Sequence, residues 1–372
     1  MNSLEVRKKT ITNIHESEFK FVIVSSGGGS NAIGSLLKVP GASNSILEAY
    51  IPYAKESLDF YLMKKPESYC SLDTTTRMAA RAYSAAKKID QKTNIEQLFG
   101  VAISATLSTN YEKKGSHRFH IAVQTRDFSQ SISCILNKGQ RTREEEEELV
   151  TEFVIALISD CCGFEFKYPE IKEDVEHIQI PAQKGWADLM SEKIKFVTSS
   201  NQQPKLIFPG AFNPMHDGHI AMSELANKEL SEEVFFEICI QNVDKPPLSY
   251  HQIKKTIDQF TDSKNWVLTK AGKFSDKAKL FPNSTFIIGA DTLVRIFDER
   301  FYASRREMME EFEIFNANNN NFLVFGREYK NKFIELNDIQ VPDSIKSRFR
   351  GFGENIFRKD VSSSTIRAQN SE

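Results

Sequence analysis

The sequence predicts an α/β protein with two domains, and three observations support this prediction. Short apolar runs alternate with stretches of helical spacing in residues 20–163 and again from Lys205 onward. A chain of 372 residues is long enough to bury two separate cores. Most strand candidates after Lys205 are continuously apolar, which is typical of parallel strands covered on both faces. We therefore expect two α/β domains, the second with a parallel sheet.

The first domain is predicted over residues 1–165, where strand and helix candidates alternate. The strand candidates are short apolar runs bounded by polar residues or glycine, at 21–24, 100–104 and 119–123. The helix candidates have apolar residues at helical spacing, at 74–88 and 143–158. The second helix opens with the acidic run 144–148, which suits a helix start and which we interpret as a solvated face.

Periodicity is lost between the two domains, and we expect a linker over 166–203. Pro169 and the polar run 199–203 are typical of loops. The second domain is then predicted over 204–372. Its strand candidates are four runs rich in apolar residues, at 206–208, 234–240, 285–288 and 322–325.

Composition excludes several classes of protein. The net charge of −2 gives no indication of a general nucleic-acid or membrane binder. No apolar stretch approaches the roughly 20 residues of a membrane span, and the first ten residues lack the apolar region of a signal peptide. The five cysteines are scattered without zinc spacing, so we expect free thiols, a cytoplasmic location and no metal ligated by the protein alone.

Residues 210–219 carry the strongest functional signal. They read Gly-Ala-Phe-Asn-Pro-Met-His-Asp-Gly-His and lie between the strand candidate 206–208 and an amphipathic run from Ile220. A strand, a tight turn and a helix are therefore expected, with His216 and His219 on one helix face. The free amides and the dipole of a helix N-terminus favour an anion there. Two imidazoles beside that anion indicate a triphosphate whose charge shifts during reaction.

A second candidate follows the strand at 285–288, where Gly289-Ala290-Asp291 forms a Gly-x-Asp sequence. Ligands of open α/β sheets bind beyond the carboxyl ends of the strands. A glycine at that end allows close approach of a ligand, and the Asp291 carboxylate can accept from ribose hydroxyls or help to place Mg²⁺. By itself the pattern is weak, because a loop aspartate has the same sequence.

A third candidate lies near the C-terminus, where Val361 to Arg367 read Val-Ser-Ser-Ser-Thr-Ile-Arg. Serines before a short helix offer hydroxyl and backbone donors, and a guanidinium is suited to phosphate. Residues 242–248 add Lys245 before two prolines, in a stiff loop from which a lysine could reach a phosphate. A helix cap and a rigid surface turn are the alternative interpretations of these two segments.

Taken together, these motifs resemble the H-x-G-H nucleotidyltransferase superfamily, with its Rossmann-like fold, and most closely the nicotinamide or nicotinate mononucleotide adenylyltransferases. The resemblance implies transfer of an adenylyl group from ATP to a mononucleotide, with Mg²⁺ carried by the ATP phosphates. It implies that His216, His219 and Arg367 act in catalysis. It implies substrate-binding roles for a further set, namely Gly210, Ala211, Phe212, Asn213, Lys245, Gly289, Asp291, Ser362 and Ser363.

Two alternatives stay open for the second domain. Cytidylyl or adenylyl transfer to another phosphorylated small molecule is one, although cytidylyltransferases usually have an Arg-Thr-Glu-Gly-Ile-Ser-Thr stretch where this chain reads Phe357-Arg-Lys-Asp-Val-Ser-Ser363. A protein that binds pyridine nucleotides without turnover is the other. The base is not specified, because the related enzymes often stack the pyridine ring on a tryptophan. Residues 297–302 contain no tryptophan, and their phenylalanines and tyrosine are the candidates for an aromatic platform.

The first domain contains a glycine-rich sequence, Ser25-Ser-Gly-Gly-Gly29, after its first strand, which is typical of a phosphate-binding loop. With Ile51 to Leu58 it resembles the C-terminal domain of the CinA (competence-damage-inducible) family, which includes nicotinamide mononucleotide deamidases. The resemblance aligns Leu58 with the catalytic lysine and Gly27 with a cysteine. Since leucine cannot move a proton, we expect an inactive deamidase-like domain, with Lys55 as a weaker substitute. Such domains often self-associate, which implies a possible homo-oligomer.

Overall fold

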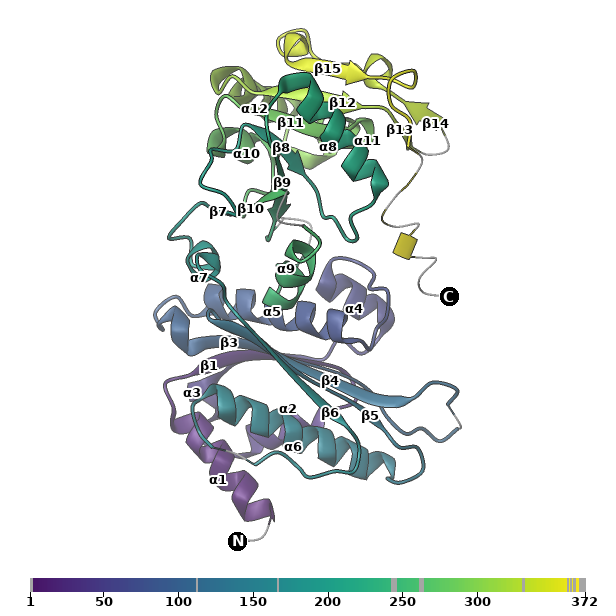
Figure 1. Cartoon of the computed structure of the whole chain (residues 1–372). Helices are drawn as coiled ribbons and strands as arrows, with labels where there is room; N and C mark the ends of the chain where they lie inside the picture. Colours follow the sequence, from purple (N-terminus) through teal and green to yellow (C-terminus); the bar gives the residue numbers. More distant parts are fainter. Residues whose placement is uncertain are drawn as a thin grey trace. The chain divides into compact units, whose positions relative to one another are not determined.

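The computed structural model describes residues 3–111, 113–165, 167–241, 246–260, 264–329, 332–359, 361, 363 and 366–367 (Figure 1). The chain forms two compact units. Unit 1 contains Met1–Ser191 and Val243–Lys254, and unit 2 contains Glu192–Asn242 and Lys255–Glu372. Each unit has its own main sheet, which confirms the prediction of two α/β domains.

Unit 1 is built on a six-stranded mixed sheet in the order β2-β1-β3-β4-β5-β6. Strand β1 pairs in parallel with β2 and β3, and the remaining neighbours are antiparallel. The strands are β1 (Lys20–Gly27), β2 (Ile46–Tyr50), β3 (Leu98–Thr106), β4 (His117–Gln124), β5 (Phe128–Leu136) and β6 (Val175–Pro181). The three predicted strands of this domain are therefore confirmed as β1, β3 and β4.

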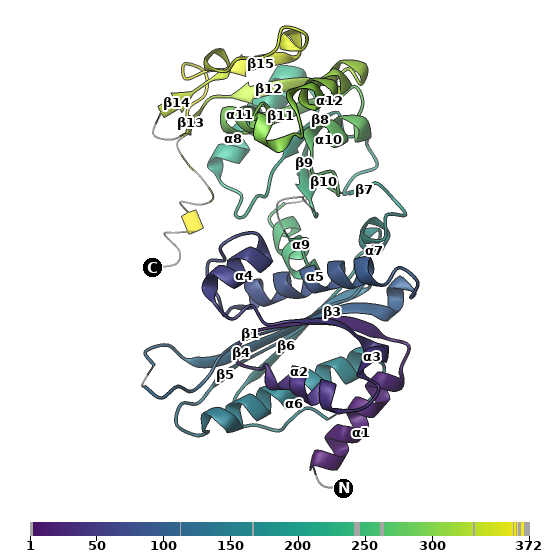
Figure 2. The same ribbon diagram turned by 180° about the vertical axis from the view of Figure 1, so that it is seen from behind.

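Helices cover both faces of this sheet, as Figures 1 and 2 show, with α4 and α5 on one face and α1, α2 and α6 on the other. Successive side chains of β1 point to opposite faces of the sheet, which fits these two helix layers. Phe21 and Ile23 pack in one core, whereas Val22 and Val24 pack in the other. The helices are α1 (Ser3–Glu16), α2 (Asn31–Lys38), α3 (Ala42–Ser45), α4 (Lys55–Leu62), α5 (Leu72–Ile89), α6 (Arg143–Cys161) and α7 (Trp186–Met190).

Unit 2 is built on a seven-stranded sheet in the order β15-β12-β11-β8-β9-β10-β7. All neighbours are parallel except β7, which pairs antiparallel with β10. The strands are β7 (Phe196–Thr198), β8 (Leu206–Pro209), β9 (Val234–Cys239), β10 (Asn265–Thr269), β11 (Thr285–Gly289), β12 (Asn321–Phe325) and β15 (Phe349–Phe352). From β8 the chain runs outward through β9 and β10, and then returns to place β11 and β12 on the other side. The order reverses between β8 and β11, which is where such sheets bind ligands.

The helices of unit 2 include α8 (Asp217–Leu230), α10 (Phe274–Leu280), α11 (Ala290–Ile296) and α12 (Arg305–Ala317). Helix α9 (Tyr250–Ile257) begins in unit 1, and its last residues belong to unit 2. The core between the sheet and these helices is rich in phenylalanine, with Phe235, Phe286, Phe312, Phe315 and Phe322 almost fully buried. A small hairpin, β13 (Arg327–Tyr329) and β14 (Lys332–Ile334), follows β12.

The domain boundaries differ from those expected from the sequence. Residues 166–203 were expected to be a linker, yet they contain β6 of the first sheet and β7 of the second. Unit 1 extends to Ser191, and the described residues 246–254 also pack within it. Over the described residues, no helix combines the length and the apolar character that crossing a bilayer requires.

Candidate active site

The candidate site lies at the carboxyl ends of β8 and β11, beside the point where the strand order reverses. The loop 210–216 follows β8 directly, and α8 begins at Asp217. His216 is the residue before the helix and has an extended backbone (φ −145°, ψ 168°). The strand, turn and helix predicted for this segment are thus confirmed.

The rings of His216 and His219 are stacked on each other, with centroids 3.7 Å apart and an interplanar angle of 24°. The backbone N–H of His216 donates to Nδ1 of His219 at 3.3 Å. A neutral His219 therefore carries its proton on Nε2. Gly218 completes the arrangement, because a Cβ at that position would lie 3.0 Å from Nδ1 of His216. The H-x-G-H sequence is therefore required for close stacking at this helix start.

Both imidazoles favour the neutral form. Burial is the largest cause and lowers the pKa of His219 to about 3, with His216 and Arg327 contributing in the same direction. Burial and Arg327 also lower the pKa of His216 below its usual value. His216 is only 8% exposed, and neither of its ring nitrogens has a hydrogen-bond partner among the described residues. A buried polar ring without a partner is costly in a folded protein, and it indicates a ligand-binding position.

The loop 210–215 is held by Phe212, whose side chain is 1% exposed. Its ring packs edge-on against His219, with centroids 5.1 Å apart. Gly210 is needed because a Cβ there would lie 2.5 Å from the Phe212 ring. The Gly210 N–H donates to the Glu237 carbonyl oxygen at 3.0 Å, so this expected phosphate donor is already used. Ala211 is exposed on the same loop.

A small open pocket adjoins the histidine pair, and most of its lining comes from the ends of strands and from the C-terminal segment. It is lined by His216, Gly218, His219, Met222, Gly289, Phe325, Gly326, Arg327, Phe357, Lys359 and Val361. Arg327 and Lys359 make this pocket suitable for an anion. The predicted Gly289 is part of the lining.

Asp291 lies at the start of α11 with Oδ1 buried and without a hydrogen bond within the described chain. Its Oδ1 is 3.8 Å from Nε of Arg327, which is an ion pair at long range. Gly289 allows this position, because a Cβ there would lie 2.5 Å from the same oxygen. The Gly-x-Asp pattern therefore places a carboxylate beside the cation of the pocket.

The C-terminal motif reaches the loop of the histidine pair. The Ser363 hydroxyl donates to the Pro214 carbonyl oxygen at 2.8 Å, and the Arg367 guanidinium donates to the Asn213 carbonyl oxygen. These bonds bring two of the three motifs together. Ser362 and Lys245 lie outside the described residues.

Sequence reasoning missed Arg327 and Lys359. Arg327 follows a predicted strand by two residues, at its carboxyl end, so the rule that located Asp291 could have found it. Lys359 carried no such signal. The aromatic platform considered at 297–302 is engaged elsewhere, since Phe297 packs on Phe312 and Tyr302 donates to the Ile296 carbonyl oxygen.

The glycine-rich loop of unit 1 is occupied by the protein itself. The Glu147 carboxylate accepts from the Gly29 N–H at 2.9 Å and from the Asn31 N–H at 3.1 Å. This corrects the interpretation of 144–148 as a solvated face. Glu146 is fully buried and bonds to His117 at 2.8 Å, and Glu148 pairs with Arg7.

The positions aligned with deamidase residues are structural in this chain. Leu58 is fully buried in a core, and a Cβ on Gly27 would lie 2.1 Å from the Ala105 carbonyl oxygen. The Ser26 hydroxyl donates to the Pro52 carbonyl oxygen at 3.0 Å. Tyr53 is 68% exposed, and Lys55 lies over the Tyr69 ring, 5.5 Å from its centroid.

Comparison with known families agrees with the geometry of unit 2. Residues 207–369 match the model of the family described as cytidylyltransferase-like. This region therefore carries a domain of the nucleotidyltransferase superfamily, which supports nucleotidyl transfer as its general activity. No curated protein is significantly similar to the chain.

Several solved structures are similar to part of the chain at low identity. The competence/damage-inducible protein CihA from Agrobacterium tumefaciens is 16% identical, with a TM-score of 0.31, and the match covers 43% of this chain and 91% of that one. A competence- or damage-inducible protein from Enterobacter asburiae is 14% identical, with a TM-score of 0.36, covering 44% and 99%. A CinA-superfamily protein from Escherichia coli is 12% identical, with a TM-score of 0.34, covering 42% and 90%.

Proposed function

We propose that unit 2 transfers an adenylyl group from ATP to the phosphate of a mononucleotide, with nicotinamide or nicotinate mononucleotide as the acceptor. The observation that carries this proposal is the stacked pair His216 and His219, which lies beside a cationic pocket at the reversal point of a parallel sheet. An acceptor phosphate oxygen attacks the α-phosphorus of ATP. The bond to the bridging oxygen breaks, and pyrophosphate leaves with that electron pair.

In this proposal the protein aligns the phosphates and stabilises charge as it moves to the leaving group. His219 donates from Nε2, and the buried ring of His216 gains the partner that it lacks among the described residues. Neutral imidazoles can fill this role, because each keeps one ring N–H that can donate to a phosphate oxygen. The amides at the start of α8 favour the same negative charge.

Cations around the pocket complete the phosphate site. Arg327 and Lys359 line the pocket, and Arg367 is held beside the same loop through Asn213. In the free protein Asp291 offsets the charge of Arg327, and we propose that it accepts from a ribose hydroxyl when substrate is bound.

Mg²⁺ enters this proposal with ATP. We propose that phosphate oxygens provide most of the ligands of this metal. The Oδ1 atom of Asp291 has no hydrogen-bond partner among the described residues, and this carboxylate could contact the hydrated ion. The ion would neutralise phosphate charge.

A second candidate activity is cytidylyl transfer to a phosphorylated small molecule. The description of the matched family favours this activity. The motif at 361–367, with its closing Ile366 and Arg367, favours adenylyl transfer instead. The choice of nucleotide separates the two.

For unit 1 we propose a binding or structural role without deamidation. A buried leucine at position 58 cannot act as a base, and the Glu147 carboxylate already uses the loop amides. The same assay tests this proposal, because deamidation of nicotinamide mononucleotide releases ammonia.

The test is incubation of the purified chain with ATP or CTP, Mg²⁺ and each candidate acceptor, with measurement of pyrophosphate and identification of the product. We expect a dinucleotide from ATP with a pyridine mononucleotide, and no ammonia. Pyrophosphate release with CTP but not with ATP would indicate cytidylyl transfer instead. Binding of mononucleotide in calorimetry without turnover would identify a non-catalytic nucleotide-binding protein.

The variant that tests the role of the histidine pair is His219→Ala. We expect turnover to fall by about 10²–10³-fold, since that is the usual cost of one lost transition-state contact. His177→Ala is the control, because His177 is an exposed histidine on β6 of unit 1. Normal turnover in folded His219→Ala would contradict the assignment of this histidine to catalysis.

A further inference from the structure

Gln259 makes two bonds to the loop that carries His216. It lies two residues after α9 ends at Ile257. Its Oε1 accepts from the Met215 N–H at 2.8 Å, and its Nε2 donates to the Phe212 carbonyl oxygen at 2.8 Å. Both bonds have ordinary lengths and the right polarity for an amide.

These two bonds bracket the part of the loop that needs support. Phe212 has a positive φ of 43°, in the region that disfavours residues with a side chain. Residues 213 and 214 lie between the two bonded backbone groups, and His216 follows Met215 directly. The amide of Gln259 therefore fixes both ends of the turn that leads to the histidine pair.

We propose that Gln259 is a positioning residue for the His216–His219 pair. The expected effect on turnover rests on the proposed function, whereas the expected effect on the histidine pair does not. Gln259 bonds to Met215 and Phe212, which are not residues of the pocket lining, so it acts through the loop. Weaker contacts of its Nε2 with the Thr256 and Lys255 carbonyl oxygens, at 3.3 and 3.5 Å, tie the side chain to the end of its own helix.

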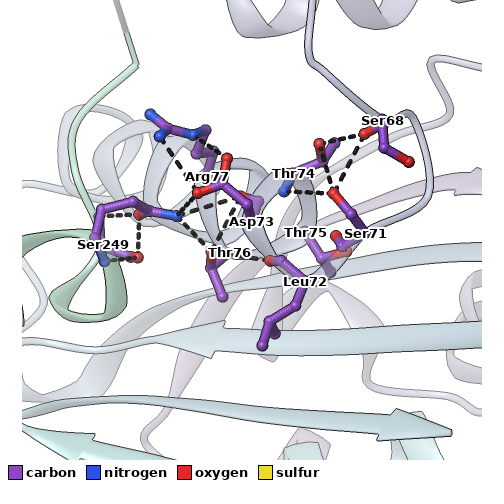
Figure 3. Close-up of polar contacts among 10 residues, drawn as sticks. Ser68, Ser71, Leu72, Asp73, Thr74, Thr75, Thr76, Arg77 and Ser249 are labelled. Atoms are coloured by element: carbon purple, nitrogen blue, oxygen red, sulfur yellow. Dashed lines mark hydrogen bonds and ion pairs between the residues drawn. The ribbon is translucent and has the colours of Figure 1, made fainter. Parts of the chain in front are cut away.

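The first turn of α9 is fixed by a separate set of bonds within unit 1. Tyr250 is fully buried, and its N–H donates to the Ser129 hydroxyl at 3.0 Å. Gln252 is 5% exposed, and its Nε2 donates to the Thr76 hydroxyl at 2.6 Å and to Asp73. Figure 3 shows Ser249 beside Asp73 and Thr76 in this network. These bonds lie within unit 1, so the positioning role rests on the bonds of Gln259 itself.

A purely structural role for Gln259 would lower stability without changing the histidines. Gln259→Met separates the two possibilities, because it keeps a similar volume and removes both bonds. Gln259→Glu keeps an acceptor for Met215 but loses the donor to Phe212 while ionised. Lys255→Met is the control, since Lys255 is exposed on the same helix.

The first readout is the NMR titration of His219, which does not depend on any substrate. We expect its pKa to rise from about 3 toward the ordinary 6.5 in Gln259→Met, because a released loop exposes the ring to water. The second readout is turnover, where we expect kcat to fall by about 10- to 100-fold with a smaller change in KM. Gln259→Glu should lie between the parent and Gln259→Met, and Lys255→Met should match the parent.

An unchanged His219 titration and kcat in folded Gln259→Met would overturn the proposal. A shifted titration in a protein that transfers no nucleotide would support the positioning role and reject the proposed function.

Discussion

The His216 and His219 rings form a stacked pair in which His216 lowers the tendency of His219 to become charged. The His216 ring contributes to the low pKa of His219, and Arg327 acts on both. A cation close to two imidazoles would ordinarily be unfavourable if either were protonated. The arrangement is stable because both rings are neutral, and it leaves the positive charge of Arg327 available for an anion.

Arg327→Ala should therefore change both the histidines and the reaction. We expect the pKa values of His216 and His219 to rise, because the nearby positive charge that lowers them is removed. Turnover should fall by about 10²-fold or more if Arg327 contacts the triphosphate. NMR titration and steady-state kinetics measure the two effects. Arg327→Lys should retain the charge and part of the activity, and Arg306→Ala is the control, because the Arg306 side chain is exposed on α12. Parent-like kinetics in Arg327→Ala would remove this residue from the site.

Gly289→Ala should reduce activity without unfolding the protein. The new Cβ would lie 2.5 Å from Oδ1 of Asp291, so this carboxylate must move away from its place beside Arg327. We expect a rise in the KM for ATP or the acceptor and a lower kcat. Gly34→Ala is the matched control, because nothing lies within 4 Å of its Cβ and alanine favours a helix by roughly 1 kcal/mol. Equal kinetics in the two variants would contradict the role of Asp291.

Lys277→Met should destabilise unit 2. Lys277 is 3% exposed, and its Nζ is 2.7 Å from Glu237, which is itself 1% exposed and also accepts from Thr269. Removing one partner of a buried ion pair leaves an uncompensated charge, at a cost of about 3–5 kcal/mol. Urea unfolding followed by Trp266 fluorescence in a Trp186→Phe background measures it. Adding Glu237→Gln should recover part of the loss, and no recovery would show that packing alone is responsible.

Stability should fall as the pH drops from about 6.5 toward 4.5. Burial lowers the pKa values of His120 and His251 to about 4 and that of His219 to about 3. Below pH 6.5 the unfolded chain binds protons that the folded chain does not, so the unfolded state gains free energy of protonation. The stability that comes from burying these histidines in the neutral form is fully present above pH 6.5. It is lost as the pH falls toward their pKa values in the folded protein. Urea unfolding across this range checks it. His251→Gln should give a shallower dependence, and a stability that rises on acidification would contradict the burial of these rings.

The strands of both cores could be predicted because their apolar runs are local signals. Ile207, Phe235, Phe286 and Phe322 all lie in runs that the sequence marks as strands, and all are buried. Strand β6 was missed because it is an edge strand with one neighbour and mostly exposed or half-buried residues, so little hydrophobic signal accompanies it. Residues 243–254 could not be assigned to unit 1, because that assignment depends on packing between distant parts of the chain.

Part of the candidate site could also be predicted, because some of its residues lie in local sequence motifs. His216, His219 and Asp291 belong to short sequences whose spacing carries chemical meaning. Gln259 acts on a loop 44 to 47 residues earlier in the chain, and no local pattern marks it. The amide of Gly210 was expected to bind phosphate, yet β9 already uses it through Glu237. Sequence spacing identifies which groups are available, and only the fold decides which of them are already bonded.

The Glu147 carboxylate of α6 accepts from amides of the glycine-rich loop in unit 1. These bonds connect the loop that follows the first strand to α6. A phosphate-bearing molecule would have to displace this carboxylate from the loop amides. Because the carboxylate belongs to the same chain, its local concentration does not depend on the concentration of the protein. A nucleotide could bind that loop only by outcompeting this internal carboxylate. If unit 2 binds a nucleotide as proposed, the internal competitor in one of the two glycine-containing turns would favour the turn that ends in His219.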